Sequence, residues 1–211
     1  MTCLYIADIS TLPDPKVRPK IMDTLSPERK QRIARCTQEQ ARRQRLGAGL
    51  LLQQVFHNHE VKSGALRLGK YGKPEIEGLN FNLSHSGNIV ACAVSKETVG
   101  CDVEKLREAP PKIGDRFFCE REKQYLRMLA GQQYDREFFR LWTIKESYLK
   151  MTGEGLSFPM RRLEIDLKDS VKIIRDGILQ PCFVREYIVS GYQVSVCSKE
   201  DEFAEMIQVN I

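Results

Sequence analysis

The chain repeats one order of segments, helix-forming residues followed by strand-forming residues, and this repetition constrains its fold most. Helical patterns cover 26–57 in one set and 120–129 and 134–151 in the other, and short runs of strand formers follow each set. The dipeptide Pro110-Pro111 lies between the two sets and indicates a connection. Each set is about 100 residues long, the size of a small domain. We therefore predict an α+β fold, a pseudo-twofold duplication of two similar α+β halves (1–108 and 109–211), with the active site in the cleft between them.

The first helical pattern opens with a recognisable start signal. In the Ser-Pro-Glu sequence at 26–28, serine can cap the helix, proline suits the first turn, and glutamate lies near the positive end of the dipole. We expect one break near 36–37. The expected buried stripe contains Leu46, Leu50 and Val55, whereas Arg42, Arg43 and Arg45 are expected to face elsewhere.

Two acids follow a predicted strand over 98–103. Asp102 and Glu104 are separated by one residue, so a strand places both on the same face. Neighbouring carboxylates repel each other unless a proton or cation lies between them, and a hard cation such as Mg²⁺ binds through such oxygens. Taken alone, the pair is also compatible with two solvated acids at a strand end.

A third acid lies on the predicted helix that ends near Met151. Trp142, Glu146 and Lys150 are spaced four apart, so they share one helix face. Glu146 and Lys150 alone could form an exposed ion pair. Because the chain's single tryptophan is on the same face, we expect this face to be partly buried and to line a cleft.

Two further segments contain groups that suit a phosphate. The sequence FNLSHSG at 81–87 combines hydroxyls, an imidazole and a glycine, and we expect it to form a turn between strands that offers hydrogen-bond donors to a phosphate. The sequence YGKP at 71–74 indicates a tight turn that displays a lysine.

Charge and composition narrow the class of protein. The net charge of +5 favours an anionic partner, whether a nucleic acid, a phosphorylated small molecule or an acidic protein. Seven scattered cysteines without a CxxC pair, and only three histidines, give little support to a zinc site. The N-terminal sequence MTCLYIADIS is unlike a signal peptide, and no apolar run approaches the roughly 18 residues of a membrane helix. We therefore expect a cytoplasmic protein.

In this order, the motifs resemble those of the Sfp-type 4′-phosphopantetheinyl transferases. The resemblance runs from about residue 25 to 160 and includes a basic helix that starts at 26–29. The matching stretches are GKP at 72–74, FNLSHS at 81–86, VGCDVE at 99–104, WTIKESYLK at 142–150 and GEGL at 153–156. Cys101 stands where the family more often has an aliphatic residue, and we expect it to point into the core.

The resemblance implies an enzyme of the holo-(acyl-carrier-protein) synthase type. It would transfer the 4′-phosphopantetheine moiety of coenzyme A to a serine of an acidic acyl or peptidyl carrier protein and release adenosine 3′,5′-bisphosphate. The resemblance also fits a monomer, since the two halves of one chain supply the cleft. It implies no nucleic-acid or membrane partner.

Site residues carry over from the resemblance one by one. The Mg²⁺ ligands would be Asp102, Glu104 and Glu146. Catalysis would fall to Lys150, at the coenzyme A phosphates, and to Glu146, the expected base for the serine. The other coenzyme A contacts would be Ser84 and His85 at a phosphate, Gly72, Lys73 and Pro74 on the adenine side, Arg29 and Arg32 near the 3′-phosphate, and Arg43 and Gln44 in the nucleotide region.

Other functions remain open at this point. A different Mg²⁺-dependent enzyme could act on a nucleotide pyrophosphate, for example by hydrolysing it. The basic helix is compatible with nucleic-acid binding, although the chain lacks interleaved aromatics or a nucleic-acid motif. A catalytically silent coenzyme A binder is disfavoured by the intact acids and lysine.

Overall fold

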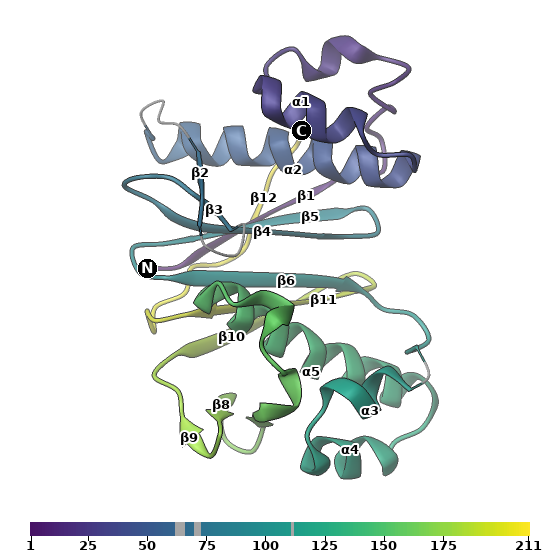
Figure 1. Cartoon of the computed structure of the whole chain (residues 1–211), viewed down its shortest axis with the longest axis vertical. Coiled ribbons are helices and arrows are strands. Elements are labelled where there is room, and N and C mark those ends of the chain that lie inside the picture. Colours follow the sequence, from purple (N-terminus) through teal and green to yellow (C-terminus); the bar gives the residue numbers. More distant parts are fainter. Residues whose placement is uncertain (62–65, 70–72, 111) are drawn as a thin grey trace.

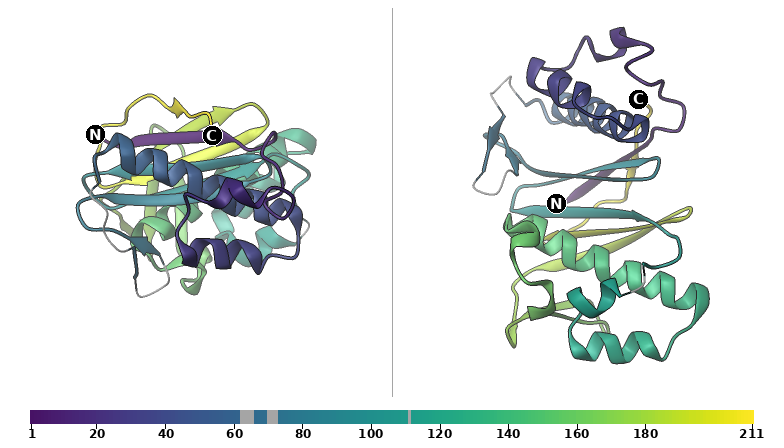
Figure 2. Two further views of the ribbon diagram at one scale, coloured as in Figure 1. Left: turned by 90° about the horizontal axis from the view of Figure 1, so that it is seen from above. Right: turned by 45° about the vertical axis from the view of Figure 1, so that its right-hand side comes forward.

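The protein is built around two main β-sheets that stack face to face, with helices on both outer faces (Figure 1). The computed structural model describes residues 1–61, 66–69, 73–110 and 112–211. Figure 2 shows the same stacking from the side, with α1 and α2 above the sheets and α5 below them. The expected α+β fold is confirmed.

The first sheet has the strand order β12-β1-β5-β4. Its strands are β1 (Cys3–Asp8), β4 (Asn80–Ser86), β5 (Ile89–Ser95) and β12 (Ile207–Gln208). The helices on its outer face are α1 (Pro27–Ala34) and α2 (Glu39–Asn58), which follow a short 3₁₀ helix, η1 (Pro19–Met22). The predicted helix start is confirmed, since the Ser26 hydroxyl accepts the Arg29 backbone N–H, and the predicted break separates α1 from α2.

The second sheet has the strand order β10-β11-β6. Its strands are β6 (Val99–Lys105), β10 (Phe183–Val189) and β11 (Tyr192–Ser198). The helices on its side are α3 (Ile113–Phe117), α4 (Glu120–Arg127) and α5 (Gly131–Thr152). Gly153 ends α5 in the left-handed conformation (φ 79°), which glycine adopts without steric cost.

The smaller elements connect the helices to the main sheets. They are the hairpin of β2 (Arg67–Leu68) and β3 (Pro74–Glu75), the 3₁₀ helices η2 (Gly155–Ser157) and η3 (Met160–Arg162), and the sheet of β7 (Leu163–Asp166), β8 (Lys172–Arg175) and β9 (Ile178–Leu179).

The two halves have the same order of elements, which is the predicted duplication. In each, a long helix (α2 or α5) leads through a small sheet into a long antiparallel hairpin, β4-β5 or β10-β11. The next strand then crosses to the other half: β6 pairs with β11, and β12 pairs with β1. The expected division into 1–108 and 109–211 would fall after β6, so that one strand would cross it in each direction.

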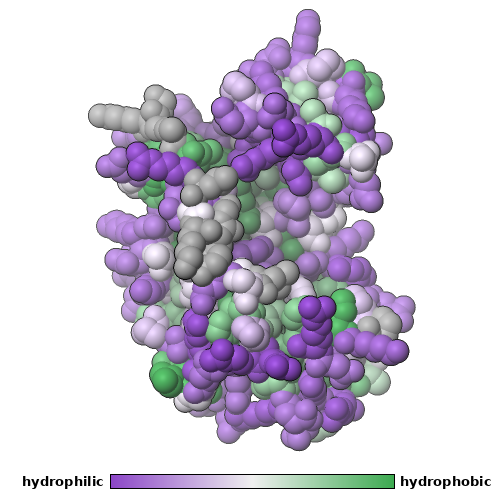
Figure 3. Space-filling model, in the orientation of Figure 1, coloured by the Kyte–Doolittle hydropathy of each residue, from purple (hydrophilic) through white to green (hydrophobic). Residues whose placement is uncertain are grey.

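Apolar side chains fill three zones of this stack. One lies between α1–α2 and the first sheet, one between the two sheets, and one between α5 and the second sheet. Cys101 is fully buried between the sheets, as expected. Among the described ranges, the helices lack the combination of length and apolar character that crossing a membrane requires. The face seen in Figure 3 is mostly hydrophilic, with small separate hydrophobic areas.

The prediction for Arg42 is wrong. Leu46 and Val55 are buried and Leu50 is half-buried, as expected, but Arg42 lies on the buried side as well. Its guanidinium forms a two-pronged ion pair with Asp14 and donates to the carbonyl oxygens of Cys36 and Thr37. A buried arginine is tolerated when its donors are satisfied in this way, and a helical period does not reveal such partners.

Candidate active site

The segment 81–86 is part of a strand and not of the turn that the sequence suggested. It belongs to β4, and the turn follows at Gly87, where φ is 52°. Phe81 is buried against α2, whereas Asn82, Ser84 and Ser86 project from the opposite side toward β6. The period-2 alternation of polar and apolar residues in this segment is that of a strand. The residues thus reach the site through side chains, because their backbone pairs with β5.

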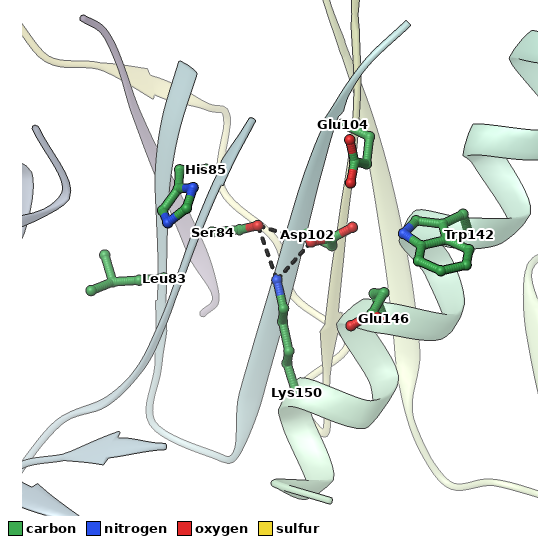
Figure 4. A pocket seen from close by; sticks show the side chains of 8 residues that line it. All are labelled: Leu83, Ser84, His85, Asp102, Glu104, Trp142, Glu146 and Lys150. Atoms are coloured by element: carbon green, nitrogen blue, oxygen red, sulfur yellow. Dashed lines mark hydrogen bonds and ion pairs between the residues drawn. The ribbon is translucent and has the colours of Figure 1, made fainter. Parts of the chain in front are cut away.

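A pocket of about 290 Å³ opens where β4, β6 and α5 meet. The side chains that line it are Leu83, Ser84, His85, Asp102, Glu104, Trp142, Glu146 and Lys150. Figure 4 shows β4, β6 and α5 contributing to its walls. Six of the residues predicted for the site thus come together, and the expected cleft-lining face of Trp142, Glu146 and Lys150 is confirmed.

The fold brings α5 very close to β6 at Gly100. A Cβ atom at that position would come within 2.1 Å of the Ser147 carbonyl oxygen and 2.3 Å of the Met151 nitrogen. Only glycine allows this approach. The approach positions Lys150, one residue before Met151 on α5, within reach of Asp102, two residues after Gly100 on β6.

Lys150 links α5 to both strands. Its Nζ donates to Asp102 Oδ1 (2.6 Å) and to Ser84 Oγ (3.0 Å), and Ser84 Oγ donates to the same carboxylate oxygen (2.8 Å; Figure 4). Burial opposes the charge of Lys150, but the nearby carboxylates of Asp102 and Glu146 outweigh this cost and raise its pKa. The pocket therefore keeps a protonated amine beside its acids.

The pocket disfavours the ionised form of Glu146. Burial, followed by repulsion from Asp102, raises its pKa to about 7, with a further contribution from Glu104. The side chain is buried, and the residue is 8% exposed. A buried carboxylate with this pKa favours either a bound proton or a bound cation near neutral pH.

The donor set of the pocket fits a hard divalent cation. The second oxygen of Asp102, Oδ2, is buried and has no hydrogen-bond partner among the described residues. Glu104 and Glu146 line the same pocket and add carboxylate oxygens, the ligands that Mg²⁺ prefers. Within the described ranges, however, no three acidic, histidine or cysteine side chains converge into a preformed metal cage. Lys150 holds one Asp102 oxygen, so a cation would use the other.

His85 lies at the pocket wall next to positive charge. Desolvation, followed by the charges of Lys150 and Arg45, lowers its pKa. The residue is exposed on the pocket side and lines the same pocket as Lys150. A neutral imidazole can donate one hydrogen bond to an anion, and the anion would in turn favour the charged form.

Two of the predicted adenine-side residues, Lys73 and Pro74, lie at the start of β3, outside the pocket lining. Pro74 begins β3. Lys73 is half-buried, not displayed, and donates to the Val99 carbonyl oxygen at the start of β6 (2.9 Å), and burial lowers its pKa. Gly72 lies outside the described residues. The pocket that Ser84 and Lys150 line includes neither Lys73 nor Pro74.

The predicted basic contacts on α1 and α2 are also outside the pocket lining. Arg29 packs its side chain against Gly49, and burial lowers its pKa. Arg32 is exposed. Arg43 pairs with Glu39 (2.6 Å). Gln44 donates to the Gly87 carbonyl oxygen (3.0 Å) and so holds the turn between β4 and β5.

Three residues matter to the geometry but were not predicted for the site. Ser86 contacts Glu104, and its place in the alternating pattern of β4 was an available signal. Gly100 interrupts a run of strand formers, which can mark a close backbone approach. Lys145 is fully buried and pairs with Glu122 (2.5 Å), and no feature of the helical pattern indicates this.

Comparisons with known proteins agree with the resemblance. Residues 98–197 match the model of the 4′-phosphopantetheinyl transferase superfamily. The chain is 32% identical over 197 residues to the 4′-phosphopantetheinyl transferase Sfp of Bacillus subtilis, covering 89% of this chain and 88% of Sfp. It is 38% identical over 140 residues to the transferase HetI of a Nostoc species, covering 61% of this chain and 59% of HetI.

A solved structure also matches in part. It is a holo-(acyl-carrier-protein) synthase from Bacillus anthracis in complex with CoA, with a TM-score of 0.41 and 18% identity over 47% of this chain and 92% of that one. The near full-length similarity to Sfp shows the family on its own. The chain therefore belongs to the Sfp-type 4′-phosphopantetheinyl transferases.

Proposed function

We propose that the protein transfers the 4′-phosphopantetheine moiety of coenzyme A to a serine of an acyl or peptidyl carrier protein and releases adenosine 3′,5′-bisphosphate. One observation carries the proposal: Asp102, Glu104, Glu146 and Lys150 meet in a single pocket between the halves, and one Asp102 oxygen has no hydrogen-bond partner among the described residues. Three acids beside one lysine suit a bound cation and a pyrophosphate better than they suit a neutral substrate.

Asp102, Glu104 and Glu146 would hold Mg²⁺. Bound there, the cation would supply neutralisation of the negative charge that develops on the pyrophosphate oxygens. Asp102 is held for this role by Ser84 and Lys150, which both bond to its Oδ1.

Side chains of the chain itself would neutralise charge, accept the proton of the serine and donate hydrogen bonds to a phosphate. Lys150, whose pKa is raised, stays protonated and would neutralise the leaving phosphate. Glu146 would accept the proton of the attacking serine hydroxyl. Ser84 and His85 would donate to a phosphate of coenzyme A from the β4 wall.

The residues outside the pocket lining would contact the rest of coenzyme A. Arg29 and Arg32 would lie near the 3′-phosphate, Arg43 and Gln44 in the nucleotide region, and Gly72, Lys73 and Pro74 on the adenine side. The net charge of +5 supports an anionic substrate and an acidic carrier. We further propose that a monomer in the cytoplasm performs the reaction, since one chain supplies all three elements of the pocket.

A loading assay tests the proposal directly. Purified protein is incubated with coenzyme A and a panel of apo carrier proteins, with Mg²⁺ present or replaced by EDTA, and the carriers are weighed by mass spectrometry. We expect a Mg²⁺-dependent mass gain of one phosphopantetheine and equimolar adenosine 3′,5′-bisphosphate. Coenzyme A cleavage in water without carrier loading would instead indicate a pyrophosphate hydrolase. Salt-sensitive DNA or RNA binding without loading would indicate a nucleic-acid protein.

A further inference from the structure

The two sheets are joined at the site by side chains of β4 that reach the edge of β6. These strands are the edges of different sheets, so they share no backbone ladder. Alternate β4 residues accept alternate β6 backbone N–H groups: Cys101 to Asn82 Oδ1 (2.9 Å), Val103 to Ser84 Oγ (3.3 Å) and Lys105 to Ser86 Oγ (3.1 Å). We call these three bonds the edge link. It satisfies amides that an edge strand otherwise leaves open.

The two serines of the edge link also hold the acids of β6. Ser84 donates to Asp102 Oδ1 (2.8 Å), and Ser86 donates to Glu104 Oε2 (2.9 Å). A hydroxyl has a single proton, so accepting an amide and donating to a carboxylate fixes its orientation. Each serine therefore restrains one carboxylate relative to the β6 backbone.

Ser86 differs from Ser84 in its relation to the pocket. Ser84 lines the pocket and accepts Lys150, whereas Ser86 is not part of the pocket lining. The other group on Glu104 Oε2 is Arg107 (3.1 Å), whose side chain is 49% exposed and therefore a weak restraint. An effect of Ser86 on the chemistry would pass through Glu104 or through the β6 backbone, whose Lys105 N–H Ser86 also accepts.

We propose that Ser86 is a positioning residue, which fixes Glu104 through Oε2 and leaves Oε1 for a divalent cation. The inference rests on the proposed function, because it assumes that Glu104 is a metal ligand. A carboxylate held by a half-buried hydroxyl, such as that of Ser86, loses less freedom when it binds a cation than one that rotates freely. Removal of such a supporting hydrogen bond typically weakens metal binding about 10- to 100-fold.

The test measures Mn²⁺ affinity, which does not depend on turnover. Free Mn²⁺ is followed by electron paramagnetic resonance during titration of the full chain with coenzyme A present. We expect Ser86→Ala to raise the Mn²⁺ Kd about 10- to 100-fold. Ser86→Thr, which keeps the hydroxyl, should stay near wild type. If Ser86→Ala does not fold, Ser86→Cys keeps the size but donates weakly, and it should show the same loss.

Asn82→Ala is the matched control, since Asn82 makes an edge-link bond and, in the part of the chain that the structure describes, its side chain has no hydrogen bond to an acid of the pocket. It should lower the melting temperature without changing the Mn²⁺ Kd. An unchanged Kd in Ser86→Ala and Ser86→Cys, or an equal loss in Asn82→Ala, would overturn the positioning role. If wild type binds Mn²⁺ but loads no carrier, the transferase proposal fails, while the Kd of the variants still decides the role of Ser86.

Discussion

Asp102 and Glu146 face one pocket, and the charge of Asp102 helps to raise the pKa of Glu146 to about 7. Burial is the larger cause. The amine of Lys150 bonds to Asp102, and among the described residues no hydrogen bond to Glu146 relieves this repulsion. Glu146 is therefore the acid whose state should respond most clearly to pH and to divalent cations.

The first prediction concerns stability and pH without a divalent cation. The pKa of Glu146 is higher in the folded protein than in an unfolded chain, so its stabilising contribution is present below about pH 4.5 and is lost as pH rises through 7. Glu146→Gln should therefore gain stability over wild type as pH rises, by up to about 3 kcal/mol at pH 8. Denaturant unfolding in EDTA from pH 5 to 8 measures the difference. Glu97→Gln, at an exposed position, should show no such trend.

The second prediction concerns catalysis. Glu146→Gln removes the base and Asp102→Ala removes the carboxylate that pairs with Lys150, so each should lower the rate of carrier loading about 100- to 10,000-fold. Mass-spectrometric rates with saturating coenzyme A measure the loss, and circular dichroism checks the fold. Near-normal loading by both variants would contradict the assignment of these acids.

The pocket residues could be predicted because each lies in a short local motif. The four-residue spacing of Trp142, Glu146 and Lys150 and the alternation of Asp102 and Glu104 follow from backbone geometry alone. The alternation of polar and apolar residues over 81–86 was a local signal for a strand, but the sequence could not show that the polar side chains of this strand bind the edge of β6. That contact joins two sheets and has no local signal.

The sequence also did not reveal which charged side chains are buried. Arg42 looks like its neighbours in a basic helix, yet its partner Asp14 is 28 residues away in the chain. Lys145 lies in the predicted motif, yet its partners are on α4 and around η3. Helical periodicity gives the face of a residue but not the distant acid or carbonyl that makes its burial tolerable.

The third prediction tests the close approach of α5 to β6. Gly100→Ala would place a methyl group 2.1 Å from a backbone oxygen of α5, so the helix must move. We expect a loss of about 1–3 kcal/mol in unfolding free energy, and slower loading because Lys150 shifts away from Asp102. At Gly114 the nearest atom to an added Cβ is a side-chain carbon at 3.3 Å. Gly114→Ala should therefore lose less unfolding free energy than Gly100→Ala, as measured by chemical denaturation. Equal effects would refute the close-approach argument.

The fourth prediction concerns the buried pair of Lys145 and Glu122. Lys145 also donates to the carbonyl oxygens of Met160 and Leu163, and Glu122 accepts the amides of Cys119 and Ile165. Lys145→Met should cost about 3–5 kcal/mol, because it leaves a buried carboxylate unpaired. Adding Glu122→Gln should recover part of this loss in urea unfolding. A double variant that is less stable than Lys145→Met would mean that the pair is not coupled.

The last prediction separates two adjacent arginines of α2. Arg42 is buried and ties Asp14 to the α1–α2 connection, whereas Arg43 is half-buried and pairs with Glu39 on its own helix. Arg42→Gln should lower the melting temperature strongly, because it leaves Asp14 and two carbonyl oxygens without their partner. Arg43→Gln should barely change the melting temperature, because an ion pair between neighbouring turns of one helix, with its acid Glu39 exposed, contributes little. If Arg43 contacts the nucleotide, Arg43→Gln should instead weaken coenzyme A binding in isothermal titration calorimetry. Unchanged affinity would remove Arg43 from the coenzyme A site and leave Arg42 as the arginine that this helix needs for folding.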